Sequence, residues 1–191
     1  MDYNQPNLIV SDILTEAEIA MVYSHIERTP EDKTFVEPFF GHRAYFSWLP
    51  DAVVAKLTAM AQTTTDKKLE LRELSFARYE SSLKPMLHPH LDKVFYEPRL
   101  TFDVQVGGNV KWPIIVEGRE YTLENNQALT FSGTHQIHWR PKQEFVEGDY
   151  LDMIFCHFSE VGATPNSLGD EHYLPLLARC DKILEEYYNE S

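Results

Sequence analysis

The stretch RLTFDVQVGGNV occupies residues 99–110 and shows the pattern on which the fold prediction rests. A short run of β-forming residues ends at the turn residues Gly107-Gly108-Asn109. Short runs of β-forming residues separated by turn residues extend from Leu69 to Phe158. We expect strands at Glu73–Tyr79, Met86–His90, Arg99–Val106, Ile114–Val116, Glu120–Leu123, Ala128–Phe131 and Tyr150–Phe158. Short strands spaced this closely predict a β-sandwich or barrel rather than a sheet of βαβ units.

Helical segments flank this β region on both sides. Thr15-Glu16-Ala17-Glu18 fits a capping box, and the helix that it begins should end before Pro30. Asp51 is expected to cap a second helix, and a third covers roughly Tyr173–Tyr188. The mainly β chain is therefore expected to form one domain over residues 1–191, with a helical support, a β core and a C-terminal helix in residues 1–68, 69–158 and 159–191.

The chain is acidic, because its 191 residues include 17 Lys and Arg against 30 Asp and Glu, for a formal charge of −13. Such a surface repels phosphate backbones, so we expect no nucleic-acid partner. The two cysteines cannot form a disulfide framework, and the N-terminus lacks the basic start and apolar run of a secretion signal. The apolar runs are too short to span a membrane. These features predict a cytoplasmic protein without a membrane partner.

Two histidine-rich segments carry the candidate chemistry. Within His88-Pro89-His90-Leu91-Asp92, side chains two residues apart point to the same face of an extended strand. His90 and Asp92 can therefore bind one divalent ion, and a third ligand can come from His135 or His138 in the second segment. Two histidines and one carboxylate on one face of a metal form the facial triad of non-haem iron(II) oxygenases.

Several short segments resemble the iron(II)- and 2-oxoglutarate-dependent oxygenases, particularly the prolyl-4-hydroxylase-like branch of that superfamily. The resemblance spans roughly residues 8–158, and its segments occur in the family's order. The start of the family's N-terminal helix is similar to Leu8–Glu18, and its Arg-Tyr strand is similar to Phe76–Tyr79. Its HxD motif is matched by His90–Asp92, and the strand after that motif is similar to Arg99–Val106. Its distal histidine segment is similar to Leu129–Arg140.

This resemblance implies a fold and an activity. The fold is a double-stranded β-helix, a cupin-like jelly roll with the metal near one open end. The activity couples decarboxylation of 2-oxoglutarate to succinate with oxidation of an unactivated C–H bond, so the cofactors would be Fe(II) and 2-oxoglutarate, with ascorbate as a reductant. Carried over residue by residue, the resemblance makes His90, Asp92 and His138 the iron ligands, with His135 as the alternative to His138. Asp92 also argues against a halogenase, which typically has a small residue there.

The cosubstrate anchor departs from the family pattern. A basic residue usually follows the distal histidine at a characteristic interval and binds the far carboxylate of 2-oxoglutarate, but Gly148-Asp149 stands there. We favour Arg140, because a guanidinium can bind a carboxylate through two parallel hydrogen bonds. Tyr79 is expected to supply a further hydrogen bond. The alternative cations are Lys142, Arg99 and Arg78.

The expected function is hydroxylation of a small molecule, an amino acid or a peptide. The alternative is a cupin-like metal-binding protein of another class, such as an isomerase or a dioxygenase that does not use 2-oxoglutarate, because jelly rolls support many chemistries. A catalytically silent binding module is disfavoured by the complete set of ligand residues. Beside the ligands, His88 is expected to orient an iron ligand or touch substrate, whereas His157 and Cys156 are expected in the core.

Overall fold

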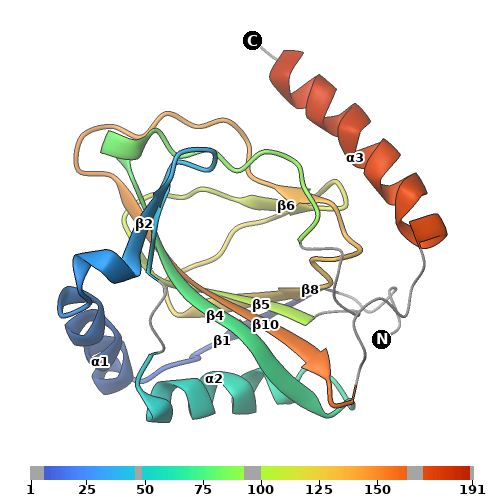
Figure 1. The fold of residues 1–191 in the computed structure, drawn as a ribbon. Helices are drawn as coiled ribbons and strands as arrows, with labels where there is room; N and C mark the ends of the chain where they lie inside the picture. The colour runs from blue at the N-terminus through green and yellow to red at the C-terminus, as the bar shows by residue number, and fades with distance from the viewer. Residues whose placement is uncertain (1–6, 46–48, 93–99, 163–169, 190–191) are drawn as a thin grey trace.

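Two antiparallel sheets face each other in the computed structural model, which describes residues 7–45, 49–92, 100–162 and 170–189 (Figure 1). The larger sheet has the strand order β1-β8-β5-β10-β4-β3-β2, and the smaller has the order β7-β6-β9. The strands are β1 (Leu8–Ser11), β2 (Thr34–Glu37), β3 (His42–Tyr45), β4 (Leu69–Glu80), β5 (Leu100–Gly108), β6 (Ile114–Val116), β7 (Arg119–Tyr121), β8 (Gln127–Phe131), β9 (His138–Trp139) and β10 (Tyr150–Glu160). This arrangement confirms the predicted jelly roll.

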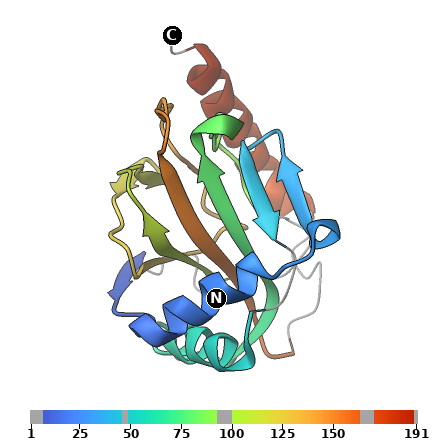
Figure 2. The same ribbon diagram turned by 90° about the vertical axis from the view of Figure 1, so that its left-hand side faces the viewer.

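Successive side chains of the central strands point to opposite faces of the large sheet, so its two faces have different surroundings. Phe102 and Ile154 point to the face covered by helices α1 (Glu16–Glu27) and α2 (Asp51–Gln62), where they join the main hydrophobic core (Figure 2). Asp103 and Phe155, one position along, point to the cavity between the two sheets. Each strand therefore supplies both the packing against the helices and the lining of the cavity.

The helix termini follow local sequence signals, with one correction. Thr15 and Glu18 form the predicted capping box, and α1 ends before Pro30. Asp51 does not cap α2, because it is already the first helical residue and Pro50 occupies the N-cap position without a side-chain hydrogen bond. The fixed φ of proline suits the entry to a helix, although proline offers no capping oxygen. Helix α3 (Asp170–Asn189) contains the predicted tail helix. None of the described helices combines the length and apolar character needed to cross a membrane.

Strand prediction fails in three places, one of which is the unexpected two-residue strand β9. Met86–His90 is not a strand: it is an extended loop whose only ladder contact is an isolated bridge between His90 and His138. Pro89 has no amide hydrogen to donate, so this segment cannot make a continuous ladder. The N-terminal region also contributes β1 and the β2–β3 hairpin to the large sheet, beyond the helices that its sequence predicts. Three residues of this region, 46–48, lie outside the described part.

Candidate metal centre

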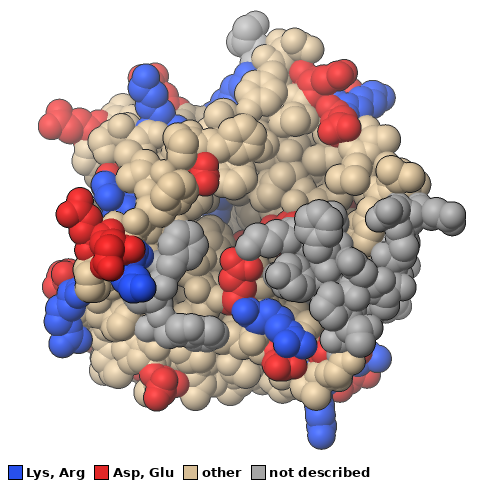
Figure 3. Space-filling model, viewed as in Figure 1, with Lys and Arg blue, Asp and Glu red and all other residues tan. Residues whose placement is uncertain are grey.

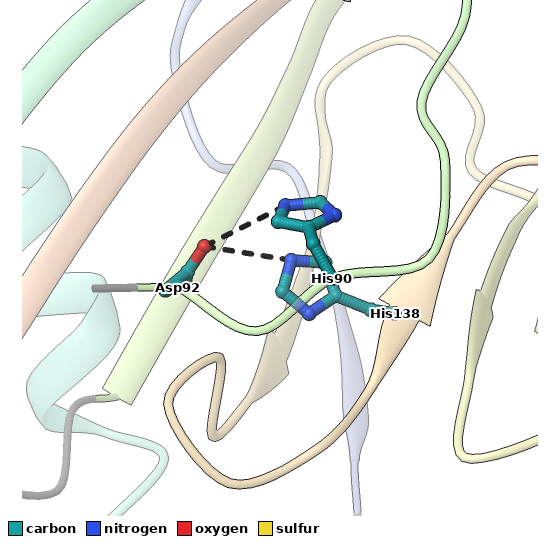
Figure 4. A group of neighbouring side chains, drawn as sticks. All are labelled: His90, Asp92 and His138. Atoms are coloured by element: carbon teal, nitrogen blue, oxygen red, sulfur yellow. Dashed lines mark ion pairs between the residues drawn. The ribbon is translucent and has the colours of Figure 1, made fainter. Parts of the chain in front are cut away.

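His90, Asp92 and His138 lie together at the wall of the cavity between the two sheets (Figure 4). The Asp92 Oδ1 atom lies 3.5 Å from the His138 Nε2 atom and 3.9 Å from the His90 Nε2 atom. One potential ligand atom from each residue lies within 4.8 Å of the other two. The backbone bridge between His90 and His138 brings the two imidazoles side by side, and Asp92 follows two residues after His90. The cluster therefore has the composition and convergence of a facial metal triad.

Backbone carbonyl groups hold both imidazoles in the same tautomer. The Nδ1 atoms of His90 and His138 lie 2.9 Å and 3.0 Å from the carbonyl oxygens of His88 and Gln136, each two residues earlier in the chain. A carbonyl oxygen can only accept, so each Nδ1 carries the proton and donates it. In a neutral ring the Nε2 atom then keeps its lone pair, directed towards Asp92, which is the state required of a metal ligand.

Asp92 is held by a backbone carbonyl of a neighbouring turn and by a side-chain hydroxyl of β5. Its amide donates to the Gly133 carbonyl at 2.8 Å, and the Thr101 hydroxyl donates to its Oδ2 atom at 3.1 Å. The Gly133 amide in turn donates to the Thr101 hydroxyl at 3.2 Å. A Cβ atom added at Gly133 would stand 1.7 Å from the Asp92 Oδ2 atom. Only glycine therefore lets the turn approach this carboxylate so closely.

The electrostatic environment keeps His90 neutral and Asp92 ionised. Burial, with the neighbouring His138, lowers the pKa of His90 to about 3. Burial alone would raise the pKa of Asp92, but the nearby His138, His157 and His90 outweigh it and hold the pKa well below its usual range. At neutral pH, two of the three candidate ligands therefore already have the protonation state that metal binding requires.

Two residues at the site were missed by sequence reasoning. His157, predicted to be in the core, instead lines the cavity: its Nε2 atom lies 3.7 Å from the Asp92 Oδ2 atom, and its Nδ1 atom lies 3.6 Å from a Glu73 carboxylate oxygen. Asp103 also lines the cavity. Both occupy inward positions of adjacent strands, so the signal was the alternation along β5 and β10. Cys156 is fully buried, as predicted.

The structure brings His138, not His135, next to the other two candidate ligands. The His135 Nδ1 atom lies 2.8 Å from the Thr134 hydroxyl and 3.2 Å from the Ser132 hydroxyl. Its ring lies against Tyr173 of α3, with the ring centroids 5.4 Å apart. His138 alone pairs with His90 through the backbone, and this pairing decides which of the two imidazoles joins the cluster.

Arg140 and Tyr79 are both buried in the interior. Arg140 is 3% exposed, and its guanidinium donates to the Trp112 carbonyl and lies 5.1 Å from the centroid of the indole ring. One of its terminal nitrogens also lies 3.8 Å from the Met153 sulfur on β10. No carboxylate among the described residues forms an ion pair with it. Burial lowers the pKa of Arg140, although nearby Tyr79 and Asp103 oppose the shift. The jelly roll thus contains a buried cation that is suited to an anion.

The alternative cations are placed differently. Arg78 points to the helix-covered face of β4, where it forms two 2.7 Å hydrogen bonds with Asp152. The Lys142 ammonium lies 5.2 Å from the centroid of the Tyr187 ring on α3. Arg99 lies outside the described residues. The Asp152 contacts of Arg78 therefore exclude it as the anchor.

His88, expected near the ligands, packs its ring against Phe39 with the centroids 4.0 Å apart, while its carbonyl orients His90.

A cavity of about 240 Å³ opens onto the three candidate ligands. Most of the surface of its wall is apolar, and the apolar side chains that contribute to it include Phe40, Leu87 and Phe155. Glu37 and Asp103 add carboxylates, and no lysine or arginine of the described residues lines it. Figure 3 shows the molecular surface hollowed near the centre of this view, with mostly uncharged residues above the hollow. The cavity can hold a small organic molecule beside a metal.

No protein-family model and no curated protein matches the sequence, whereas many solved structures match the fold. One is an oxidoreductase of the 2OG-Fe(II) oxygenase family from Burkholderia pseudomallei, which is 13% identical with a TM-score of 0.62, over 83% of this chain and 86% of that one. The α-ketoglutarate-dependent epimerase SnoN of nogalamycin biosynthesis is 12% identical with a TM-score of 0.66, over 88% and 83%. The chain shares the fold of these enzymes.

A third similar structure is HygX from Streptomyces hygroscopicus, solved with nickel, 2-oxoglutarate and hygromycin B bound. It is 15% identical with a TM-score of 0.57, over 79% of this chain and 82% of that one. The named activities of the similar structures include an epimerase and a carbocyclase as well as an oxygenase. The shared fold therefore agrees with the resemblance in the sequence but leaves the oxidative outcome open.

Proposed function

We propose that this protein is an iron(II)- and 2-oxoglutarate-dependent dioxygenase that hydroxylates a C–H bond of a small molecule, an amino acid or a short peptide. The observation that carries the proposal is the convergence of His90, Asp92 and His138, with both Nδ1 atoms tied to backbone carbonyls. Two imidazoles and one carboxylate leave half of an octahedral coordination sphere for cosubstrate and oxygen. When bound, iron supplies the oxidation chemistry that protein side chains lack.

The remaining residues bind and orient the cosubstrate. Arg140 is a buried cation without a carboxylate partner among the described residues, and a buried carboxylate without a cation is heavily penalised. We propose that the guanidinium of Arg140 binds the far carboxylate of 2-oxoglutarate. Tyr79 lines the cavity and lies near Arg140, so its hydroxyl can donate to the same carboxylate, while Lys142 remains the second choice of cation.

Arg140 also explains the departure from the family pattern. Gly148 and Asp149, where the resemblance leads us to expect a basic residue, lie just before β10, whose Leu151 and Met153 belong to a buried hydrophobic cluster. The guanidinium of Arg140 reaches the Met153 sulfur from the adjoining end of β9. A cation that directly follows β9 therefore lies next to an interior residue of β10, which supports the same role.

The proposal is tested by turnover of 2-oxoglutarate in the absence of a substrate. Purified protein supplied with Fe(II), ascorbate and 2-oxoglutarate should form succinate slowly, and the Asp92→Ala variant should form none. A mass-spectrometric screen of candidate substrates should then reveal a product heavier by one oxygen atom. A product lighter by two hydrogens, or a change of configuration without a change of mass, would replace hydroxylation by another oxidative outcome. If the protein binds metal but never consumes 2-oxoglutarate, it belongs to the other class of metal-binding jelly rolls.

A further inference from the structure

Asp103 is a buried carboxylate in the same cavity that none of the roles proposed so far uses. It lies on β5 at an inward position, is 5% exposed and lines the cavity beside His138 and Asp92. Its Oδ1 atom makes no hydrogen bond to any described residue. A buried polar atom without a partner is rare and costly, so it calls for an explanation. A ligand group that binds Asp103 would supply one.

The charges around Asp103 define the kind of group that it would bind. Fe(II), the Asp92 carboxylate and the two carboxylates of 2-oxoglutarate together carry one net negative charge, which Arg140 neutralises. His157 is paired with Glu73, so it adds no net charge when it is protonated. When it is ionised, the Asp103 carboxylate is therefore a buried negative charge that these groups do not neutralise, and buried charges are stable only when they are paired.

The cavity wall favours an organic cation over a hydrated metal ion at this position. Phe40, Tyr79 and Phe155 line the cavity, and aromatic faces attract alkylammonium groups. Glu37 adds a second carboxylate to the lining, and no lysine or arginine of the described residues lines the cavity, although the charge of Arg140 also acts on Asp103. Aromatic side chains beside a buried carboxylate suit a molecule with an apolar body and a cationic end.

We propose that the substrate is a protonated amine with an apolar body, and that its ammonium group binds the Asp103 carboxylate. The inference rests on the proposed function, because it identifies the substrate class of the same cavity. Asp103 would then be a specificity-determining residue, which places the apolar body of the amine along Phe40 and Phe155. Burial raises the pKa of Asp103 to about 7 in the absence of a partner, and a bound ammonium would stabilise the ionised form.

The test compares two probes of the same shape and different charge. Binding of 2-phenylethylamine and of 2-phenylethanol is measured by calorimetry under anaerobic conditions, with protein loaded with Fe(II) and 2-oxoglutarate. We expect the amine to bind about 10- to 100-fold more tightly than the alcohol, the range for a hydrogen bond to a charged group. The Asp103→Asn variant should lose this preference. The Asp32→Asn variant removes the same charge from the exposed surface and should retain it.

The outcomes separate the two proposals. Equal binding of amine and alcohol by the parent protein overturns the cationic substrate, and so does an Asp103→Asn variant that keeps the preference. Loading with 2-oxoglutarate is checked by the absorption of the Fe(II) complex before each titration. If that complex does not form, the proposed function fails, and the same pair of probes is titrated into metal-free protein. A preference that depends on Asp103 there still supports the amine site, and its absence overturns it.

Discussion

Gly133→Ala should disable the metal site without touching a metal ligand. The new Cβ atom would stand 1.7 Å from the Asp92 Oδ2 atom and 2.5 Å from the Thr101 hydroxyl oxygen. Carbon and oxygen atoms that are not bonded settle at about 3.5 Å, so the carboxylate must move by roughly 1.5–2 Å or the turn must open. Either movement breaks the hydrogen bonds that fix Asp92 and misplaces the only charged ligand.

The expected loss follows from what these contacts do. Removing the groups that orient a ligand typically lowers metal affinity by about 10–100-fold, and displacing the ligand itself costs more. We therefore expect Gly133→Ala to weaken Ni(II) or Fe(II) binding by at least about 100-fold. Affinity is measured by competition with a fluorescent chelator under anaerobic conditions, together with thermal unfolding of the metal-free protein.

A second glycine provides the control. Gly148 has a φ of +91° and nothing within 4 Å of the position of its Cβ, and it lies before β10 at the end opposite to His157, so Gly148→Ala strains the backbone away from Asp92. It should lower stability and leave metal affinity within about threefold of the parent, since remote sites act independently. Unchanged metal affinity in Gly133→Ala would refute the role assigned to this turn.

Three further perturbations test other parts of the account. Arg140→Ala should raise the apparent Michaelis constant for 2-oxoglutarate by at least about 100-fold with metal binding nearly intact, because a buried charge pair is broken; an unchanged constant moves the role to Lys142. His138→Ala should lose nearly all metal affinity and His135→Ala little, and equal losses would contradict the assignment. Burial lowers the pKa of His42 to about 4 from 6.5, so the folded protein resists protonation that the unfolded chain accepts. The free energy of unfolding of the metal-free protein should therefore fall from pH 6.5 towards pH 4, and urea denaturation should find a shallower fall in His42→Phe.

Local sequence signals predicted much of the fold because they depend on few residues. The Thr15 capping box, the strand around Phe102 and the apolar stripe of the tail helix each follow from spacing within one segment. Strand order and register depend on distant pairing, which no local pattern encodes. The edge strands β1, β2 and β3 have only four residues each, too few for a clear period against the helical segments around them.

At the candidate site, too, residues identified by local spacing were predicted, and residues placed by long-range strand pairing were missed. His90 and Asp92 were found through their spacing, although the reason is an extended loop rather than the predicted strand. The choice between His138 and His135 needed the backbone bridge, because two histidines three residues apart look equivalent in sequence. His157 and Asp103 were missed because their place at the site comes from strands paired across a long interval of chain. A single sequence does not show which distant strands pair, so it does not show which remote residues meet at the site.

The central claim is that His90, Asp92 and His138 hold an iron that 2-oxoglutarate can chelate. It is tested most directly by adding Fe(II) and then 2-oxoglutarate to the protein without oxygen while its visible absorption is recorded. A broad charge-transfer band should develop with 2-oxoglutarate and saturate at one equivalent of iron per chain, and it should be absent in Asp92→Ala. A parent protein that binds iron but develops no band, or an Asp92→Ala variant with the full band, would contradict the account.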